Sequence, residues 1–286
     1  MPPPAPASLF NWSTRAVSRS GIIVVAQMTA AAAPRSPFDL AGRVALVTGS
    51  SRGLGAAMAR ALAKAGADVV LHASTKAPAD AAAALASECG VRTAGLVADL
   101  QHRDAVDALV PGVLDRMGRL DIVVNNAGII RRADAVAYPD ADWDAVLEVN
   151  LSSAFRLCRA AGAHMLAAGY GKIVNIASVL SFQGGLRVPA YAAAKGGIAQ
   201  LTRALANEWA AKGVNVNAIA PGYMRTDNTR ALSDDPVRYR QILDRIPAGR
   251  WGEPDDLGGA IVFLASGASD YVHGQLLVVD GGWLGR

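Results

Sequence analysis

The sequence has few cysteines and few histidines, the residues that form disulfides and bind most structural metals. Its 286 residues include two cysteines, Cys89 and Cys158, which lie far apart in the chain. Such cysteines are typical of free thiols in a reducing compartment, which favours the cytoplasm. The four histidines have no spacing that suits a metal site. We therefore expect neither a disulfide framework nor a metal centre.

Blocks of positive charge and long apolar runs are also missing. The formal net charge is +4 at pH 7, without a cluster of lysine and arginine. Neither nucleic acid nor a membrane surface is therefore favoured as a partner. The apolar run at 21–26 is too short to span a bilayer.

The N-terminal residues 1–37 contain no acidic side chain, and the first carboxylate is that of Asp39. This segment is rich in proline, alanine and serine and carries three arginines, which is typical of a transit or secretory segment. Met28 supports another interpretation, a later translational start preceded by a disordered tail or by residues that are not translated. We adopt this second interpretation and place the folded domain at residues 38–286.

What the sequence does contain is an alternation of apolar, β-branched runs with alanine-rich helical segments. Continuous apolar strands between helices are typical of a parallel sheet covered on both faces. No linker interrupts the alternation, so we expect a single α/β domain, a Rossmann-like doubly wound parallel sheet flanked by helices. The expected strands are 43–48, 68–72, 93–98, 120–125, 172–177, 214–219 and 275–280, and the expected helices are 54–65, 78–89, 104–117, 143–168, a helix through Tyr191 to 211, and 255–265.

Four of these strands end in residues that can serve a site: Thr48, Asn125, Ser178 and Pro221. In doubly wound sheets, ligands bind beyond the carboxyl ends of the strands. We therefore expect residues far apart in the sequence to meet at that edge.

A glycine-rich turn, Thr48–Gly55, follows the first strand and opens the first helix. Its spacing, Gly-x3-Gly-x-Gly, lets the backbone approach a pyrophosphate at a helix N-terminus. The same residues match the Gly-x-Ser-x-Gly elbow of α/β-hydrolases, with Ser51 as nucleophile and His273 as base. No earlier loop is present to supply an oxyanion donor, and Gly55 has no role in an elbow. The nucleotide turn is therefore the favoured interpretation.

Tyr191 and Lys195 are four residues apart, so a helix places them on one face. An ammonium beside a phenol favours the phenolate, so we expect the pKa of Tyr191 to be lowered. Such a tyrosine can pass a proton at an alcohol or carbonyl oxygen, which the hydroxyl of Ser178 could hold. Taken alone, the Tyr-x3-Lys spacing also fits a solvated helix face.

Together these motifs resemble the short-chain dehydrogenase/reductase family over residues 38–286. The resemblance implies that Tyr191 is the acid/base and that Lys195 also binds the nicotinamide ribose. It implies that Ser178 holds the substrate oxygen and that Asn150 supports a water-mediated proton relay. The motifs are Thr48–Gly55, Asp99, Asn125–Gly128, Asn150, Ser178, Tyr191-x3-Lys195 and Pro221-Gly222.

The same resemblance places Asp99 near the adenine and Asn125, Ala127 and Gly128 along the cofactor cleft. The full set of expected cofactor-binding residues is Gly49, Ser51, Arg52, Gly53, Leu54, Gly55, Ser74, Asp99, Leu100, Asn126, Ala127, Gly128, Tyr191, Lys195, Pro221 and Gly222.

Further stretches resemble the sugar-acid branch of this family, the group of 2-deoxy-D-gluconate 3-dehydrogenases and 2-dehydro-3-deoxy-D-gluconate 5-dehydrogenases. This implies oxidation of a secondary alcohol on a deoxygluconate-type sugar acid, or its reverse. Arg131, Arg132 and Arg187 are expected near the catalytic edge, where a guanidinium can pair with a carboxylate, although each also fits a solvated surface. Gln183 could bond a sugar hydroxyl or cap a turn. The stretches are 127–132, 181–189, 207–210, 220–224, 246–252 and 280–284.

Two other functions stay open. One is a 3-oxoacyl-[acyl-carrier-protein] reductase of the same family, with a carrier protein as partner. The other is a nucleotide-binding regulator without turnover, which would not need an intact set of catalytic residues.

The second strand predicts use of both NAD and NADP. NAD enzymes of this fold usually place an acid after that strand to bond the ribose 2′-hydroxyl, and here the position is Ala73. Ser74 and Thr75 can donate hydrogen bonds to a 2′-phosphate, and Arg52 and Lys76 can add charge. The sugar-acid branch, by contrast, is associated mainly with NAD.

The family resemblance also implies a homotetramer. The C-terminal segment 278–284 is apolar enough to sit in an interface. Trp283 could instead pack within its own chain or close over the substrate.

Overall fold

The computed structural model of the protein describes residues 36–286. Within these residues, seven parallel strands form one sheet in the order β3-β2-β1-β4-β5-β6-β7. The expected N-terminal extension, 1–37, lies outside the described residues except for its last two positions. The Rossmann-like α/β fold and all seven expected strands are confirmed. The strands are β1 (Val44–Val47), β2 (Asp68–Ala73), β3 (Thr93–Val97), β4 (Ile122–Asn125), β5 (Gly171–Ile176), β6 (Val214–Pro221) and β7 (Leu276–Val279).

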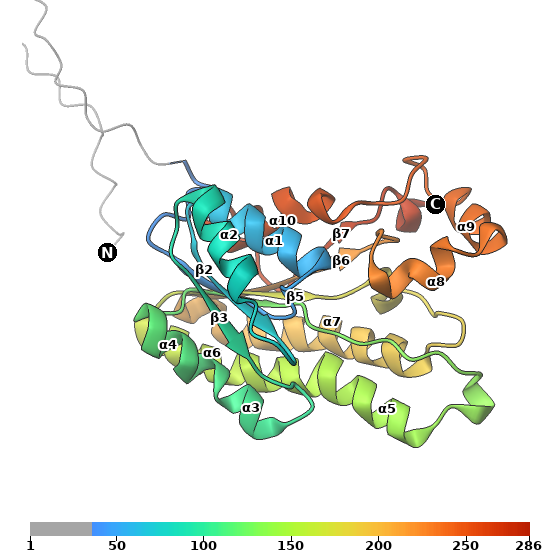
Figure 1. The fold of residues 1–286 in the computed structure, drawn as a ribbon, viewed down its shortest axis with the longest axis horizontal. Helices are drawn as coiled ribbons and strands as arrows, with labels where there is room; N and C mark the ends of the chain where they lie inside the picture. Colours follow the sequence, from blue (N-terminus) through green and yellow to red (C-terminus); the bar gives the residue numbers. More distant parts are fainter. Residues whose placement is uncertain (1–35) are drawn as a thin grey trace, which may run out of the picture. The chain divides into compact units, whose positions relative to one another are not determined.

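Successive side chains of each central strand point to opposite faces of the sheet and pack into two separate hydrophobic cores. In β1, Val44 and Leu46 pack toward α3, α4, α6 and α7, whereas Ala45 and Val47 pack toward α1, α2 and α10. Figure 1 shows these two groups of helices on opposite sides of the sheet. Burial on both faces explains why the strands are continuously apolar. The helices are α1 (Gly53–Lys64), α2 (Ala79–Cys89), α3 (Arg103–Asp107), α4 (Leu109–Met117), α5 (Asp140–Leu147), α6 (Ser153–Ala168), α7 (Pro189–Trp209), α8 (Arg230–Ser233), α9 (Pro236–Leu243) and α10 (Gly258–Ala265).

Two expected helices are interrupted. The segment predicted at 104–117 divides at Ala108 into α3 and α4. Pro111 explains the break, because its ring has no N–H and clashes with the carbonyl four residues earlier in a continuous helix. The segment predicted at 143–168 begins earlier, with α5, and contains a π-helical turn, Glu148–Ser152, before α6. Such turns are frequent at functional sites, and this one contains Asn150.

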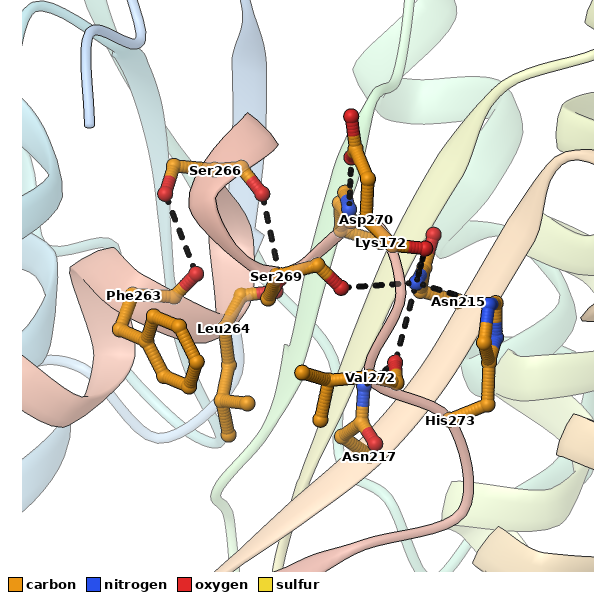
Figure 2. Close-up of polar contacts among 10 residues, drawn as sticks. All are labelled: Lys172, Asn215, Asn217, Phe263, Leu264, Ser266, Ser269, Asp270, Val272 and His273. Carbon is orange, nitrogen blue, oxygen red and sulfur yellow. Dashed lines mark hydrogen bonds and ion pairs between the residues drawn. The ribbon is translucent and has the colours of Figure 1, made fainter. Parts of the chain in front are cut away.

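A cluster of polar side chains lies at the amino ends of β5 and β6 (Figure 2). Lys172 is 1% exposed, and its Nζ lies 2.7 Å from Oδ1 of Asp270. The side-chain amide nitrogen of Asn215 lies 3.0–3.1 Å from three backbone carbonyl oxygens of the segment 269–272. That of Asn217 donates to Val272 O at 2.8 Å. This cluster attaches the loop before β7 to the sheet.

Candidate active site

The glycine-rich turn lies between β1 and α1, as the sequence predicts. Gly53 has a φ of +57°, a conformation that favours glycine. A Cβ at Gly55 would lie 2.3 Å from the carbonyl oxygen of Gly49, so this position excludes any side chain. Arg52 precedes the helix, and within residues 36–286 no side chain caps this end. The N–H groups at the start of α1 therefore remain available to an anion.

The end of β4 supports this turn. The side-chain amide of Asn126 donates to Thr48 O at 2.8 Å and to Gly49 O at 3.1 Å. The hydroxyl of Thr48 accepts from the backbone N–H groups of Asn126 and Ala127, each at 3.0 Å. Asn126 and Ala127 thus fix the turn to the neighbouring strand. Gly128 lies close to Asn150, since a Cβ there would be 3.2 Å from Oδ1 of Asn150.

The other expected cofactor residues lie along the same edge of the sheet. Ser74 directly follows β2, and Leu100 is buried two residues after Ala98, which bonds the end of β2. Asp99 accepts a hydrogen bond from the backbone N–H of Gln101 at 3.0 Å.

Arg52 forms an exposed ion pair with Asp227 at 3.4 Å. Such an exposed pair is weak, so the guanidinium of Arg52 can exchange Asp227 for another anion. At the end of β6, Pro221 is followed by Gly222, whose N–H donates to Val279 O at 3.0 Å.

The side-chain amide of Asn150 forms two hydrogen bonds with the backbone of Ile129. Its Nδ2 donates to Ile129 O, and its Oδ1 accepts from Ile129 N, both at 2.8 Å. The side chain is 2% exposed. The π-helical turn therefore holds the loop after β4 through Asn150.

Ser178, Tyr191 and Lys195 are brought together by β5 and α7. Ser178 caps the turn that follows β5, with its hydroxyl accepting from Leu180 N at 3.1 Å. Nζ of Lys195 donates to the carbonyl of Ile176 at 2.5 Å and lies 5.5 Å from the centroid of the Tyr191 ring. Three of the four residues expected to be catalytic, Ser178, Tyr191 and Lys195, thus converge at the carboxyl edge.

Ser181, which is not among the residues expected at the site, connects Ser178 with Lys195. Its hydroxyl donates to Lys195 O at 2.7 Å and accepts from Ser178 N at 3.3 Å. The Ser-x-x-Ser spacing of Ser178 and Ser181 resembles a capping box and was the available signal.

The expected pKa of Tyr191 is wrong in direction. Burial raises the pKa of Tyr191, and this outweighs a hydrogen bond with Ser178 and the charge of Arg132, both of which lower it. Lys195 is buried as well, and burial lowers its pKa to about 8. The charge of a neighbouring ammonium favours the phenolate, but removal of the phenol from water acts in the opposite direction and is larger here.

The expected substrate-binding arginines lie on two loops joined by a backbone hydrogen bond from Ala133 N to Arg187 O, at 3.1 Å. Arg131 lies 3.5 Å from Asp142, and Arg187 lies 2.9 Å from Asp134, both as exposed ion pairs. Arg187 has a φ of +63°, which is rare outside glycine. Backbone strain of this kind is frequent at binding sites.

Trp283 packs within its own chain, which was one of the expected alternatives. It is 3% exposed, lies 4.6 Å from Tyr223 between ring centroids, and is covered by Arg245 at 3.9 Å. Its indole N–H donates to Oε1 of Gln183 at 3.2 Å. Trp283 itself is therefore not an exposed interface residue, whereas Val278 is 37% exposed.

The hydrolase alternative fails on topology. Ser51 follows the carboxyl end of β1, whereas His273 precedes β7 and contacts Asn215 at the amino end of β6. The two residues lie at opposite edges of a parallel sheet. Across residues 36–286, histidine, cysteine and acidic side chains form no group of three that could hold a metal ion. No helix of this part of the chain has the length and apolar character needed to cross a membrane.

Known proteins resemble this chain over nearly its whole described length. The family model described as Enoyl-(Acyl carrier protein) reductase matches residues 49–284. The chain is 52% identical to 2-dehydro-3-deoxy-D-gluconate 5-dehydrogenase of Escherichia coli (strain K12), across 88% of this chain and 99% of the relative. It is 51% identical to the protein of that name from Bacillus subtilis (strain 168), across 87% of this chain and 97% of the relative.

Among solved structures, a gluconate 5-dehydrogenase from Burkholderia cenocepacia J2315, in complex with NADP and tartrate, is 43% identical. It superposes with a TM-score of 0.82, across 87% of this chain and 98% of that one. On its motifs, its fold and these similarities, the chain belongs to the short-chain dehydrogenase/reductase family.

Proposed function

We propose that this protein is an oxidoreductase that transfers a hydride between NAD(P) and a secondary alcohol or ketone of a deoxygluconate-type sugar acid. The observation that carries the reaction type is the convergence of Ser178, Tyr191 and Lys195 at the carboxyl edge of the sheet. The substrate class is supported by the relatives named 2-dehydro-3-deoxy-D-gluconate 5-dehydrogenase.

The turn after β1 fits a dinucleotide. A Cβ added at Gly53 would meet only Thr226, at 4.0 Å, so space is open where a pyrophosphate can approach the backbone. The dinucleotide, when bound, supplies or accepts the hydride at its nicotinamide ring. We assign the pyrophosphate to Gly49–Gly55 and the adenine to Asp99 and Leu100. The nicotinamide ribose is assigned to Tyr191 and Lys195, beside Asn126–Gly128 and Pro221-Gly222.

In ketone reduction, Tyr191 donates the proton to the substrate oxygen while Ser178 holds that oxygen. The raised pKa of Tyr191 keeps the phenol protonated near neutral pH, which suits an acid. The charge of Lys195 stabilises the phenolate that this proton transfer leaves. Asn150 keeps the loop after β4 in place through Ile129 and so orients the site.

The substrate carboxylate is assigned to the joined loops that carry Arg131 and Arg187, and a substrate hydroxyl is assigned to Gln183. Their exposed ion pairs with Asp142 and Asp134 are weak enough to exchange for a substrate. The relative in complex with tartrate, a hydroxy acid, supports a carboxylate site.

We propose that NAD and NADP are both used. Ala73 offers no carboxylate to repel a 2′-phosphate, and Arg52 lies close to the turn that we assign to the pyrophosphate. Relatives with NADP bound support the phosphorylated form.

We further propose a cytoplasmic homotetramer whose folded domain is 38–286, with 1–37 as an extension. The free thiols of Cys89 and Cys158 support a reducing compartment. Trp143 on α5 and Phe155 on α6, 38% and 42% exposed, offer apolar surface to another subunit.

Steady-state kinetics with a panel of sugar acids, each with NAD and NADP, test the function. We expect the highest kcat/KM with a deoxygluconate-type acid, and activity with both dinucleotides. A higher kcat/KM with a 3-oxoacyl thioester would contradict this assignment in favour of the acyl-carrier alternative.

A further inference from the structure

His72 is buried at the end of β2, with 1% of its surface exposed. Its backbone carbonyl accepts from Ser50 N at 2.9 Å, and its backbone N–H donates to Oγ of Ser50 at 3.0 Å. Its ring reaches two further groups. Nδ1 lies 3.1 Å from the backbone N of Gly49, and Nε2 lies 2.9 Å from the carbonyl oxygen of Ala98.

The chemistry of these partners fixes the state of the ring. A backbone N–H can only donate, so Nδ1 must accept from Gly49. A carbonyl oxygen can only accept, so Nε2 must carry the hydrogen that bonds Ala98. Only the neutral Nε2–H form satisfies both bonds. A protonated ring would direct an N–H of His72 at the N–H of Gly49 and break that contact.

The two ring contacts join separate parts of the cofactor site. Gly49 begins the turn assigned to the pyrophosphate, and Ala98 immediately precedes Asp99 and Leu100, assigned to the adenine. We propose that His72 is a positioning residue of the dinucleotide site, which sets the phosphate turn relative to the segment 98–100 through its neutral Nε2–H ring. This inference rests on the proposed use of a dinucleotide.

The surroundings of the ring disfavour its charged form. Its contacts are the Gly49 amide, the Ser50 hydroxyl on the adjoining backbone, and the Ala98 carbonyl, none of which titrates near neutral pH. Two carboxylates lie on the adjoining segments: Asp68, at the amino end of β2, pairs with Arg92 at 2.7 Å, and Asp99, next to Ala98, bonds Gln101 N and lies 3.7 Å from His102. Burial lowers the pKa of His72, with the Ala98 bond opposing this shift. Acid should therefore weaken the positioning once the ring is forced to take a proton.

Binding of NAD, measured by calorimetry from pH 5 to 8, tests this role without relying on activity. His72→Phe keeps most of the ring volume and removes both polar atoms. We expect it to raise the Kd for NAD about tenfold at pH 7, because the Gly49 N–H and the Ala98 carbonyl both lose their ring partner and part of that loss appears in binding. His72→Asn keeps an acceptor for Gly49 and does not titrate in this range. We expect its Kd to lie within about threefold of wild type at pH 7 and to lose the rise at acid pH.

His164→Asn, on α6, is the matched control and should leave Kd and its pH dependence unchanged. If the wild type does not bind NAD or NADP, the proposed function fails. If the wild type binds but His72→Phe has the same Kd and the same pH dependence, only the role of His72 is overturned.

A second measurement does not require a variant, so it tests the inference even if His72→Phe does not fold. Nitrogen-15 NMR of the histidine rings in the wild-type protein reports tautomer and charge directly. We expect His72 to be neutral, with its hydrogen on Nε2, at pH 6. A ring with hydrogen on Nδ1, or a protonated ring at that pH, would overturn the inference.

Discussion

Two lysines are buried at opposite ends of β5, and their surroundings differ. Lys172, at the amino end, forms an ion pair with Asp270 at 2.7 Å. Lys195 of α7, beside the carboxyl end, donates to the backbone carbonyl of Ile176. Burial lowers the pKa of both, but Asp270 opposes the shift at Lys172, whereas burial acts alone at Lys195 and brings its pKa to about 8.

The difference indicates a structural role for Lys172, and it is consistent with the functional role that we propose for Lys195. A buried charge with a carboxylate partner has its desolvation partly offset. One that bonds only a carbonyl destabilises the fold, and a functional need can explain why such a residue is kept. The amino edge therefore attaches a loop to the sheet, and under the proposed function the charge at the carboxyl edge serves proton transfer.

The largest expected effect comes from removing the phenol beside Lys195. Tyr191→Phe should lower kcat about a thousandfold, because the ring still packs but no proton can be donated. The Kd for the dinucleotide should stay near that of wild type. Steady-state kinetics and calorimetry measure the two quantities, and a kcat within a few-fold of wild type would remove Tyr191 from the acid/base role.

Replacing each lysine by methionine compares the two edges in activity. Lys195→Met should lower kcat about a hundredfold and weaken dinucleotide binding, because we assign it both the phenolate and the ribose. Lys172→Met should keep kcat/KM within about twofold, since it lies at the other edge. An unchanged dinucleotide Kd in Lys195→Met would show that the ribose contact is wrong.

The pH dependence of ketone reduction should report the charge on Lys195. The pKa of Tyr191 is raised, so the acid stays protonated, while Lys195 loses its proton near pH 8. The rate should be level from pH 6 to about 7.5 and fall about tenfold by roughly pH 9. Stopped-flow loss of NADPH measures it, and a rate that keeps rising to pH 9 would contradict the assignment.

A smaller effect is expected at the end of β2. Ala73→Asp should lower kcat/KM for NADP about tenfold by charge repulsion with the 2′-phosphate and leave that for NAD nearly unchanged. Kinetics with both dinucleotides give the ratio. If the ratio of kcat/KM for NADP to kcat/KM for NAD equals that of the wild type, position 73 does not face the ribose.

The sheet and the meeting of Ser178, Tyr191 and Lys195 at its carboxyl edge could be predicted from the sequence, because apolar runs and the Tyr-x3-Lys spacing depend on local pattern. Pro111 is a sequence signal for the break after α3. The π-helical turn at Asn150 has no such signal in the sequence, since it depends on tertiary contacts. The predicted direction of the Tyr191 pKa shift was wrong, because the burial of a side chain cannot be judged from residue spacing. The pairing of Gln183 with Trp283 joins residues 100 positions apart, which no local pattern indicates.

The most direct test of the comparison is the free energy of unfolding of the two lysine variants. Urea titrations at pH 7, at equal protein concentration and without dinucleotide, provide it. Lys195→Met should be more stable than wild type by about 1–2 kcal/mol. Removing a buried charge whose pKa is lowered to about 8 gains about 3 kcal/mol, and leaving the Ile176 carbonyl without its donor costs about 1–2 kcal/mol. Lys172→Met should stay within about 1 kcal/mol of wild type, since Asp270 offsets part of the burial. A Lys195→Met protein that is less stable than wild type, and less stable than Lys172→Met, would contradict the account.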